Sequence, residues 1–212
     1  MQVTRIIAIR HGETAWNVDT RLQGHLDIGL NTKGAWQAGQ VARALAGEAV
    51  QAIYTSDLQR AWHTANAIAQ TTEAPMVASR DLRERCFGSF EGKTYVELEA
   101  QWPDDALRWR KREPDWAPPG GESLLALRQR ISRTLAVMAQ QHLGGQIVLV
   151  AHGGVLDVLY RLATGQELQA PRTWHLGNAA INRLLWTTES LTLVGWGDTR
   201  HLEEATLDES SV

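Results

Sequence analysis

Segments with strand character alternate with segments of helix character along most of this chain, and this order restricts its fold more than any other feature. Val3–Ile9 is a mostly apolar run rich in β-branched residues, as expected of a strand covered on both faces. Gln146–Ala151 is a second run of this kind. The alternation predicts an α/β fold, namely a three-layer α/β/α sandwich around a mostly parallel sheet with right-handed crossovers.

Capping residues predict where the helices begin. Asn31 or Thr32 is expected to cap a helix that runs to about Ala46, and Ser56 or Asp57 is expected to cap the next one. The remaining expected elements are strands at 52–55, 75–78, 181–186 and 191–195 and helices at 58–70, 122–142 and 155–163.

All 212 residues fit one domain. Residues 90–121 are expected to form an irregular lid insertion, because a loop of this length usually covers an active site or is disordered. Its three tryptophans argue against disorder, and for each one a role as a core anchor and a role facing the substrate are equally open. The tryptophans are Trp102, Trp109 and Trp116.

The acidic tail from about 198 to 212 is expected to be mobile.

Composition excludes several classes of function. The formal net charge is −3 and no basic block stands out, so we expect neither a nucleic-acid partner nor a membrane surface. No apolar run approaches the roughly 20 residues that span a bilayer. The single cysteine, Cys86, favours a reducing compartment, and we expect a cytoplasmic protein without a signal peptide. No spacing of ligands suggests a metal site, and a homo-oligomer is left open.

Two histidines directly follow two expected strands, and each precedes a glycine. They lie in Arg10-His11-Gly12 and in His152-Gly153. Ligands of open α/β sheets bind outside the carboxyl ends of the strands, so we expect both imidazoles to meet there. A neutral imidazole attacks phosphorus without first losing a proton. His11 is therefore the candidate nucleophile, and His152 is the candidate donor to the transferred oxygens.

Further donors near these histidines favour an anionic substrate. A phosphoryl group carries its charge on several oxygens and suits guanidinium donors. Arg10 precedes the first histidine, and Arg60 lies in the first turn of an expected helix. Asn17 and Gln23, in the loop after the first strand, supply neutral donors. Each of these residues taken alone more often has a surface or structural role.

Glu84 is the candidate acid for the leaving oxygen, provided that burial or a nearby anion raises the pKa of its carboxyl group. From spacing alone, a surface ion pair with the neighbouring Arg83 or Arg85 is the better interpretation. The other histidines are expected to be structural hydrogen-bonding groups: His25, His63, His142, His175 and His201.

Five blocks in a fixed order carry a resemblance to a known family. They are Arg10-His11-Gly12-Glu13-Thr14, Arg21–Gly24, Thr55–Ala65, Leu82–Gly92 and His152-Gly153. They resemble the histidine phosphatase superfamily, and within it the phosphoglycerate-mutase-like proteins and the small broad-specificity phosphatases of the α-ribazole type. The likeness covers about residues 3–186. The acid phosphatase and phytase branch resembles Arg-His-Gly-x-Arg-x-Pro and ends in His-Asp. It is disfavoured, because this chain has Glu13-Thr14-Ala15 after the first His-Gly and has His152-Gly153 at the second place.

The resemblance implies a phosphohistidine intermediate, and for the phosphatases no metal ion and no organic cofactor. It assigns the nucleophile to His11 and the proton donor to Glu84. The implied substrate contacts lie in the same blocks or in the loop between the first two of them: Arg10, Asn17, Gln23, Gly24, Arg60 and His152.

Three functions are compatible with these residues. The leading hypothesis is a phosphomonoesterase that hydrolyses small phosphorylated metabolites. The alternative is a cofactor-dependent phosphoglycerate mutase, for which the chain is short, although a cationic run between residues 108 and 112 keeps it open. The cationic run consists of Arg108, Arg110, Lys111 and Arg112. The third function is a non-catalytic binding protein. The candidate nucleophile and acid argue against it, because a binding protein needs neither.

Overall fold

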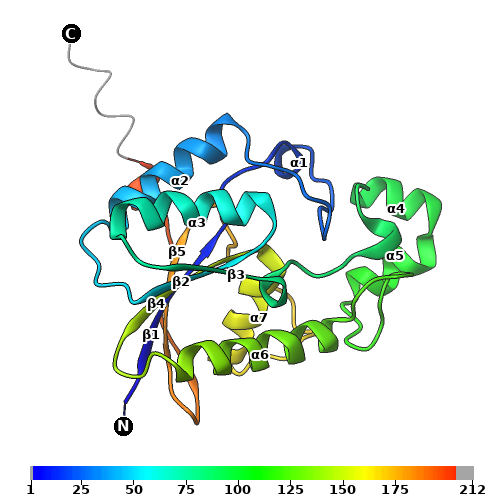
Figure 1. Ribbon diagram of the computed structural model, residues 1–212. Helices are drawn as coiled ribbons and strands as arrows, with labels where there is room; N and C mark the ends of the chain where they lie inside the picture. Colours follow the sequence, from blue (N-terminus) through cyan, green and yellow to red (C-terminus); the bar gives the residue numbers. More distant parts are fainter. Residues whose placement is uncertain (1, 204–212) are drawn as a thin grey trace.

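A six-stranded sheet with the strand order β3-β2-β4-β1-β5-β6 forms the middle layer (Figure 1). The computed structural model describes residues 2–203. The first four strands in this order are parallel, and β5 and β6 are antiparallel additions at one edge. The predicted mostly parallel sheet with a closing hairpin is confirmed. The strands are β1 (Thr4–Arg10), β2 (Ala52–Ser56), β3 (Met76–Ser79), β4 (Gln146–Ala151), β5 (Ile181–Trp186) and β6 (Leu191–Asp198).

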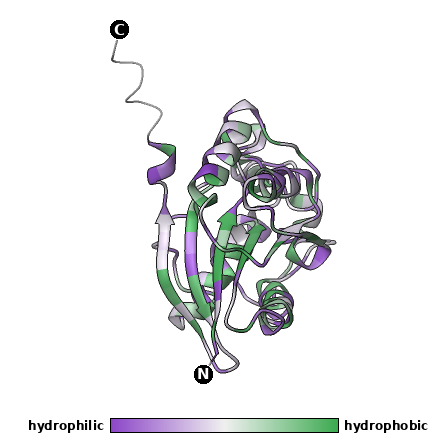
Figure 2. Ribbon diagram, turned by 60° about the vertical axis from the view of Figure 1, so that its left-hand side comes forward, coloured by the Kyte–Doolittle hydropathy of each residue, from purple (hydrophilic) through white to green (hydrophobic). Residues whose placement is uncertain are grey.

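Helices cover both faces of the sheet, which confirms the three-layer sandwich (Figure 1). Successive residues of β1 point to opposite faces. Ile6 packs against the layer of α6 and α7, whereas Ile7 packs against the layer of α2 and α3. The apolar residues accordingly concentrate in the central strands (Figure 2). The covering helices are α2 (Thr32–Leu45), α3 (Gln59–Thr72), α6 (Leu124–Gln140) and α7 (Gly153–Thr164).

One of the two expected caps is present and the other is wrong. Asn31 caps α2, because its side chain accepts a hydrogen bond from the Gly34 amide at 2.7 Å. Neither Ser56 nor Asp57 caps α3, whose N-cap residue is Leu58 and has no capping side chain. The carboxylate of Asp57 is bound by a guanidinium instead.

The missing cap of α3 is supplied from a distant loop. Asp27 accepts a hydrogen bond from the backbone amide of Gln59 at 2.7 Å, which satisfies one of the amides exposed at the start of α3. This contact spans 32 residues of sequence. A cap that comes from so far along the chain leaves no signal next to the helix.

The segment 90–121 is more regular than expected, since it contains two helices, α4 (Tyr95–Gln101) and α5 (Pro103–Arg110). A capping box of Thr94 and Glu97 starts α4, and Pro103 occupies the first turn of α5. These helices close over a small apolar cluster that includes Phe87, Phe90, Leu98, Ala106 and Trp116.

The three tryptophans of this segment lie in different environments. Trp116 is buried in the small cluster and is a core anchor. Trp102 is exposed and stacks on Phe90 with ring centroids 5.8 Å apart. Trp109 packs edge to face on Phe87 and also lines a cavity at the carboxyl end of β1.

The ordered chain extends beyond the boundary expected for the tail. Strand β6 runs to Asp198, and a 3-10 helix follows at Arg200–Leu202. The expected start of the tail at about 198 is therefore too early, and residues 204–212 lie outside the described residues. Within residues 2–203, no helix has the length and apolar character needed to cross a membrane.

Candidate active site

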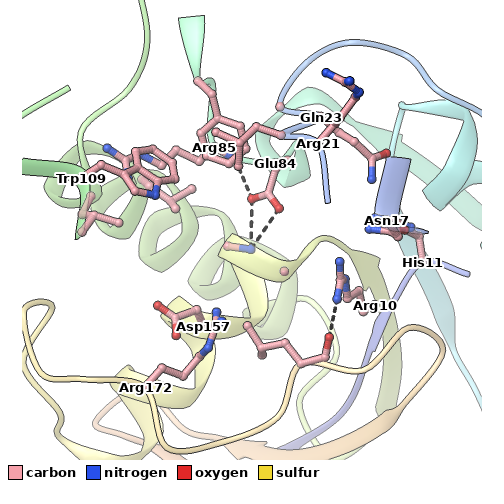
Figure 3. Close-up of a pocket in the computed structure, with 18 of the residues that line it drawn as sticks. Arg10, His11, Asn17, Arg21, Gln23, Glu84, Arg85, Trp109, Asp157 and Arg172 are labelled. Carbon is pink, nitrogen blue, oxygen red and sulfur yellow. Dashed lines mark hydrogen bonds between the residues drawn. The ribbon is translucent and has the colours of Figure 1, made fainter. Parts of the chain in front are cut away.

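A cavity of about 500 Å³ lies at the carboxyl end of β1, beside the N-terminus of α7 (Figure 3). The sequence predicted the ligand site at this place, outside the carboxyl ends of the parallel strands. A short helix, α1 (Ala15–Val18), and the loops after it close one side. All but one of the predicted site residues line this cavity, the exception being His152: Arg10, His11, Asn17, Gln23, Gly24, Arg60 and Glu84.

His11 is held so that one particular ring nitrogen is free. Its backbone amide continues the β1–β4 ladder by donating to the Ala151 carbonyl at 3.0 Å. Its Nδ1 lies 2.7 Å from the carbonyl oxygen of Gly12. Because a carbonyl only accepts, Nδ1 must carry the proton. The lone pair of the neutral ring is therefore on Nε2.

His11 and His152 meet as predicted, with ring centroids 5.2 Å apart. His152 is fully buried and is the N-cap residue of α7. Neither of its ring nitrogens has a hydrogen-bond partner in the described part of the chain. A neutral imidazole has one N–H, so His152 has a donor to offer to an oxygen bound next to His11.

Both imidazoles are kept neutral by their surroundings. Burial, followed by the charges of Arg10 and Arg60, holds the pKa of His11 well below its ordinary value. Burial and the Arg60 charge do the same to the pKa of His152. Neutral rings follow at physiological pH, and a neutral ring is the form in which histidine acts as a nucleophile.

Arg10 and Arg60 place two fixed positive charges beside His11. Arg10 donates through Nη1 to the carbonyl of Leu176. Arg60 is fully buried and donates to the carbonyls of Leu26 and Gly24, each at 2.8 Å. The Nε atoms of both arginines lack a partner within residues 2–203.

Burial lowers the pKa of Arg10 and lowers that of Arg60 to about 10. With a pKa of about 10, Arg60 stays charged at neutral pH. With donors left over after their structural hydrogen bonds, the two guanidiniums form a cup suited to a phosphoryl group.

Gly24 explains why the loop can hold Arg60. Its backbone has φ +51°, a conformation that glycine adopts without strain. A Cβ atom at this position would lie 2.1 Å from Oε1 of Glu91. In this conformation the Gly24 carbonyl accepts from Arg60, and the neighbouring Gln23 is a buried side chain that lines the cavity.

Asn17 is oriented by three donors that converge on its side-chain oxygen. The amide and hydroxyl of Thr14 lie 3.0 and 3.1 Å from Oδ1, and Nδ2 of Asn178 lies 3.2 Å from it. The Nδ2 group of Asn17 is thus left for a ligand. Asn178 also donates to the His11 carbonyl at 2.9 Å. Sequence reasoning missed Asn178, whose partners are more than 160 residues away.

Glu84 does not form the surface ion pair that its neighbours suggested. Arg83 pairs with Asp57 at 2.6 Å, and Arg85 donates to the Glu122 carbonyl at 2.7 Å. That interpretation is therefore wrong, because both adjacent guanidiniums are engaged elsewhere.

The carboxylate of Glu84 instead binds a backbone amide at the start of α7 and the amide of its own neighbour Arg85 (Figure 3). Gly154 donates to its two oxygens at 3.0 and 3.1 Å, and the Arg85 amide donates at 2.8 Å. A Cβ atom on Gly153 would lie 3.7 Å from Cζ of Arg10 and 3.8 Å from Oε2 of Glu84. The carboxylate and the Arg10 guanidinium therefore flank the same glycine, facing one cavity.

Of the cationic run at 108–112, Arg112 alone reaches this cavity. Arg108 and Arg110 form exposed ion pairs with Glu113 and Glu99. Among the other histidines, His142 is structural as expected and lies 2.9 Å from the Tyr54 hydroxyl. His175 differs from expectation because it lines the cavity. Sequence reasoning also missed several outer wall residues: Arg21, Arg85, Asp157, Arg172 and Trp174.

No group of three or more His, Cys, Asp or Glu side chains among the described residues is arranged to hold a metal ion. The polar groups of the cavity are guanidinium, imidazole, amide and carboxyl groups. Together they present an anion cup, a neutral nucleophile and a carboxyl group within one space, which is the equipment for transferring a phosphoryl group.

Comparison with known proteins gives matches over nearly the whole chain. The model of the histidine phosphatase superfamily (branch 1) matches residues 6–199. "Phosphoglycerate mutase-like protein 4" of Arabidopsis thaliana is 38% identical over 203 residues, which cover 94% of this chain and 87% of the relative. The "Metal-independent phosphoserine phosphatase" of the same plant is 36% identical over 204 residues, which cover 95% and 84% of the two chains.

A solved structure confirms the architecture. YhfR of Bacillus stearothermophilus has a TM-score of 0.87 at 28% identity, and the match covers 94% of this chain and 99% of that chain.

Proposed function

This chain belongs to branch 1 of the histidine phosphatase superfamily, and we propose that it hydrolyses phosphomonoesters of small metabolites through a phosphohistidine at His11. The family resemblance read from five sequence blocks is confirmed by the matches. One observation carries the proposed reaction. His11 is a buried neutral imidazole whose Nδ1 proton is held by the Gly12 carbonyl, so that its lone pair is on Nε2, in a cavity that Arg10 and Arg60 also line.

In the first half of the reaction, the phosphoryl oxygens bind Arg10 and Arg60, with the Asn17 and Gln23 amides as further donors. Gly24 contributes through its carbonyl, which holds Arg60 against the phosphate. Nε2 of His11 attacks phosphorus, and the bond from phosphorus to the ester oxygen breaks. The leaving oxygen takes a proton from Glu84, and His152 donates to the transferred oxygens.

In the second half, water replaces the leaving alcohol. Glu84, now a carboxylate, takes a proton from the water, and the water oxygen attacks phosphorus. The P–N bond breaks and His11 returns to its neutral form. Inorganic phosphate leaves, and Glu84 has regained its proton. The phosphate ester brings a second anionic group close to Glu84, and two anionic groups in close contact share a proton. This is the proton that Glu84 gives to the leaving oxygen.

A phosphoglycerate mutase is the second candidate, because one relative is named "Phosphoglycerate mutase-like protein 4". A mutase must retain a bisphosphate without losing phosphate to water, which calls for a closed and strongly cationic cavity. The cavity here is cationic, but of the 108–112 run only Arg112 lines it, and the insertion that would close it is shorter than is usual for mutases of this family. This favours hydrolysis.

Two assays with the purified chain separate the candidates. With p-nitrophenyl phosphate, a phosphatase releases many equivalents of phosphate per enzyme, and a binding protein releases none. With 3-phosphoglycerate and a trace of 2,3-bisphosphoglycerate, a mutase forms 2-phosphoglycerate faster than phosphate appears. We expect multiple turnovers in the first assay and phosphate release without prior isomerisation in the second.

A further inference from the structure

The outer wall of the active-site cavity carries more positive charge than its carboxylates neutralise. Beyond the cup of Arg10 and Arg60, four further arginines line the cavity, against the carboxylates of Glu84 and Asp157. Glu84 lies beside the cup, where its charge acts on Arg10 and Arg60. The four outer arginines are Arg21, Arg85, Arg112 and Arg172.

Three of the four outer arginines have structural partners. Arg21 pairs with Glu97 at 2.9 Å. Arg85 is fixed by the Glu122 carbonyl and lies over the Trp109 ring at 4.7 Å. Arg112 pairs with Asp157 and donates to the Leu168 carbonyl.

Arg172 is different. It is exposed, and it makes neither a hydrogen bond nor an ion pair with any residue between 2 and 203.

Asp157 does not compensate for Arg172, although Figure 3 shows both residues on the side of the cavity opposite Glu84 and Arg85. Its Oδ2 atom already accepts from Arg112 at 2.7 Å and from Arg161 at 3.0 Å. Two guanidiniums thus share one buried carboxylate, and this part of the wall is cationic before Arg172 is counted. The charge of Arg172 also reaches Arg10, whose pKa it helps to lower.

The loop that carries Arg172 is anchored on both sides. Before it, Arg161 donates to the carbonyls of Glu167 and Ala170. After it, Trp174 stacks on Tyr160 with ring centroids 4.0 Å apart, and the Arg161 guanidinium lies 4.7 Å from the Trp174 ring. The backbone therefore presents Arg172 from a fixed position. Such preorganisation reduces the entropy lost when a side chain binds a ligand.

We propose that Arg172 is a specificity-determining residue that binds a carboxylate on the carbon skeleton of the phosphomonoester substrate. The proposal rests on the proposed function, since the phosphoryl group fills the cup of Arg10 and Arg60 and leaves any second charge to the outer wall. A guanidinium binds a carboxylate through two parallel hydrogen bonds, which an ammonium does not reproduce. Phosphomonoesters that carry a carboxylate are thereby selected over phosphomonoesters of the same length whose carbon skeleton is uncharged.

The test compares two esters that differ only in this group. In 3-phosphoglycerate a carboxylate stands where glycerol 3-phosphate has a hydroxymethyl group. We expect the wild-type chain to have the higher kcat/KM on 3-phosphoglycerate. Arg172→Gln should lower the ratio of the two kcat/KM values by about tenfold, the effect of one charge-assisted hydrogen bond. Arg172→Lys should give an intermediate ratio, because it keeps the charge without the bidentate geometry.

Arg43→Gln is the matched control. Arg43 is an exposed arginine on α2 that does not line the cavity, so its loss changes the net charge equally and should leave the ratio unchanged. Equal ratios for wild type and Arg172→Gln, with phosphate released from both esters, would overturn the role of Arg172 while the phosphatase stands. Absence of phosphate release from either ester and from p-nitrophenyl phosphate would overturn the proposed function itself.

Discussion

At His11, the carbonyl of Gly12 and the charges around the ring act together. The carbonyl, 2.7 Å from Nδ1, fixes the tautomer, while burial and two guanidiniums disfavour the protonated ring. A histidine in this setting has its lone pair on Nε2 and needs no base to expose it. The residue that does need to exchange a proton in the proposed reaction is Glu84.

Glu84→Gln keeps the size of the side chain and removes its acid. We expect kcat/KM to fall by about 100-fold on an alkyl phosphate, whose leaving oxygen requires a proton. On p-nitrophenyl phosphate, which has a good leaving group, the fall should be less than about tenfold. Glu73→Gln, at an exposed position that ends α3, serves as the control. Equal losses on the two esters would remove Glu84 from the acid role.

At the scale of the element, the N-terminus of α7 sets the position of this carboxylate. The Gly154 amide binds both oxygens of Glu84, and a Cβ atom on Gly154 would lie 2.3 Å from Oε1. Gly154→Ala must therefore displace the carboxylate. Since a displacement of about 1 Å can cost about 100-fold in rate, we expect a loss of at least tenfold on alkyl phosphates.

Gly39→Ala provides the comparison for Gly154→Ala, because Gly39 lies in α2 and a Cβ atom there meets nothing within 4 Å. It should leave kcat/KM unchanged and raise the free energy of unfolding by up to about 1 kcal/mol through helix propensity. Kinetics and urea unfolding of both variants check this. Full activity in Gly154→Ala would show that the carboxylate does not depend on this close approach.

The elements also show how far local patterns predict this structure. Apolar runs and the Asn31 cap predicted the sheet and its covering helices, since these signals lie within a few residues. The cap of α3 by Asp27 was unpredictable, because it comes from 32 residues away. The two helices of segment 90–121 carried local signals at Thr94 and Pro103, but the prolines of this segment favoured the prediction of an irregular loop.

At the scale of the whole molecule, buried neutral histidines link stability to pH. His11 and His152 have pKa values well below the ordinary 6.5 in the folded protein. Below about pH 6.5 the unfolded chain therefore binds more protons than the folded one. The contribution of the two neutral histidines to the free energy of unfolding is fully present above that pH. It is lost as the pH falls toward their pKa values in the folded protein, by up to about 1.4 kcal/mol per pH unit for each histidine.

Urea unfolding between pH 7.5 and 5.5 measures this dependence. The carboxyl groups with lowered pKa values have ordinary values of 3.8 to 4.5, so they add little in this range. His152→Asn has no titrating ring and should show a shallower slope of unfolding free energy against pH. A slope identical to that of the wild type would contradict a neutral buried His152.

The candidate site itself was predictable where motif residues adjoin strand ends, as with His11 and Arg10, and through the family resemblance for Glu84 and Arg60. Its supporting groups were not. Asn178 donates hydrogen bonds to His11 and Asn17, which lie more than 160 positions earlier in the sequence. Arg172 has no hydrogen-bond or ion-pair partner within residues 2–203, and no local sequence pattern reveals this.

Trapping the covalent intermediate tests the central claim most directly. The chain is mixed with a phosphate ester carrying radiolabelled phosphorus and quenched during turnover, and the labelled peptide is mapped. We expect a base-stable, acid-labile adduct on the peptide that contains His11, and no adduct in His11→Ala, which should also be inactive. Label on another residue, or turnover of His11→Ala at the wild-type rate, would contradict the account.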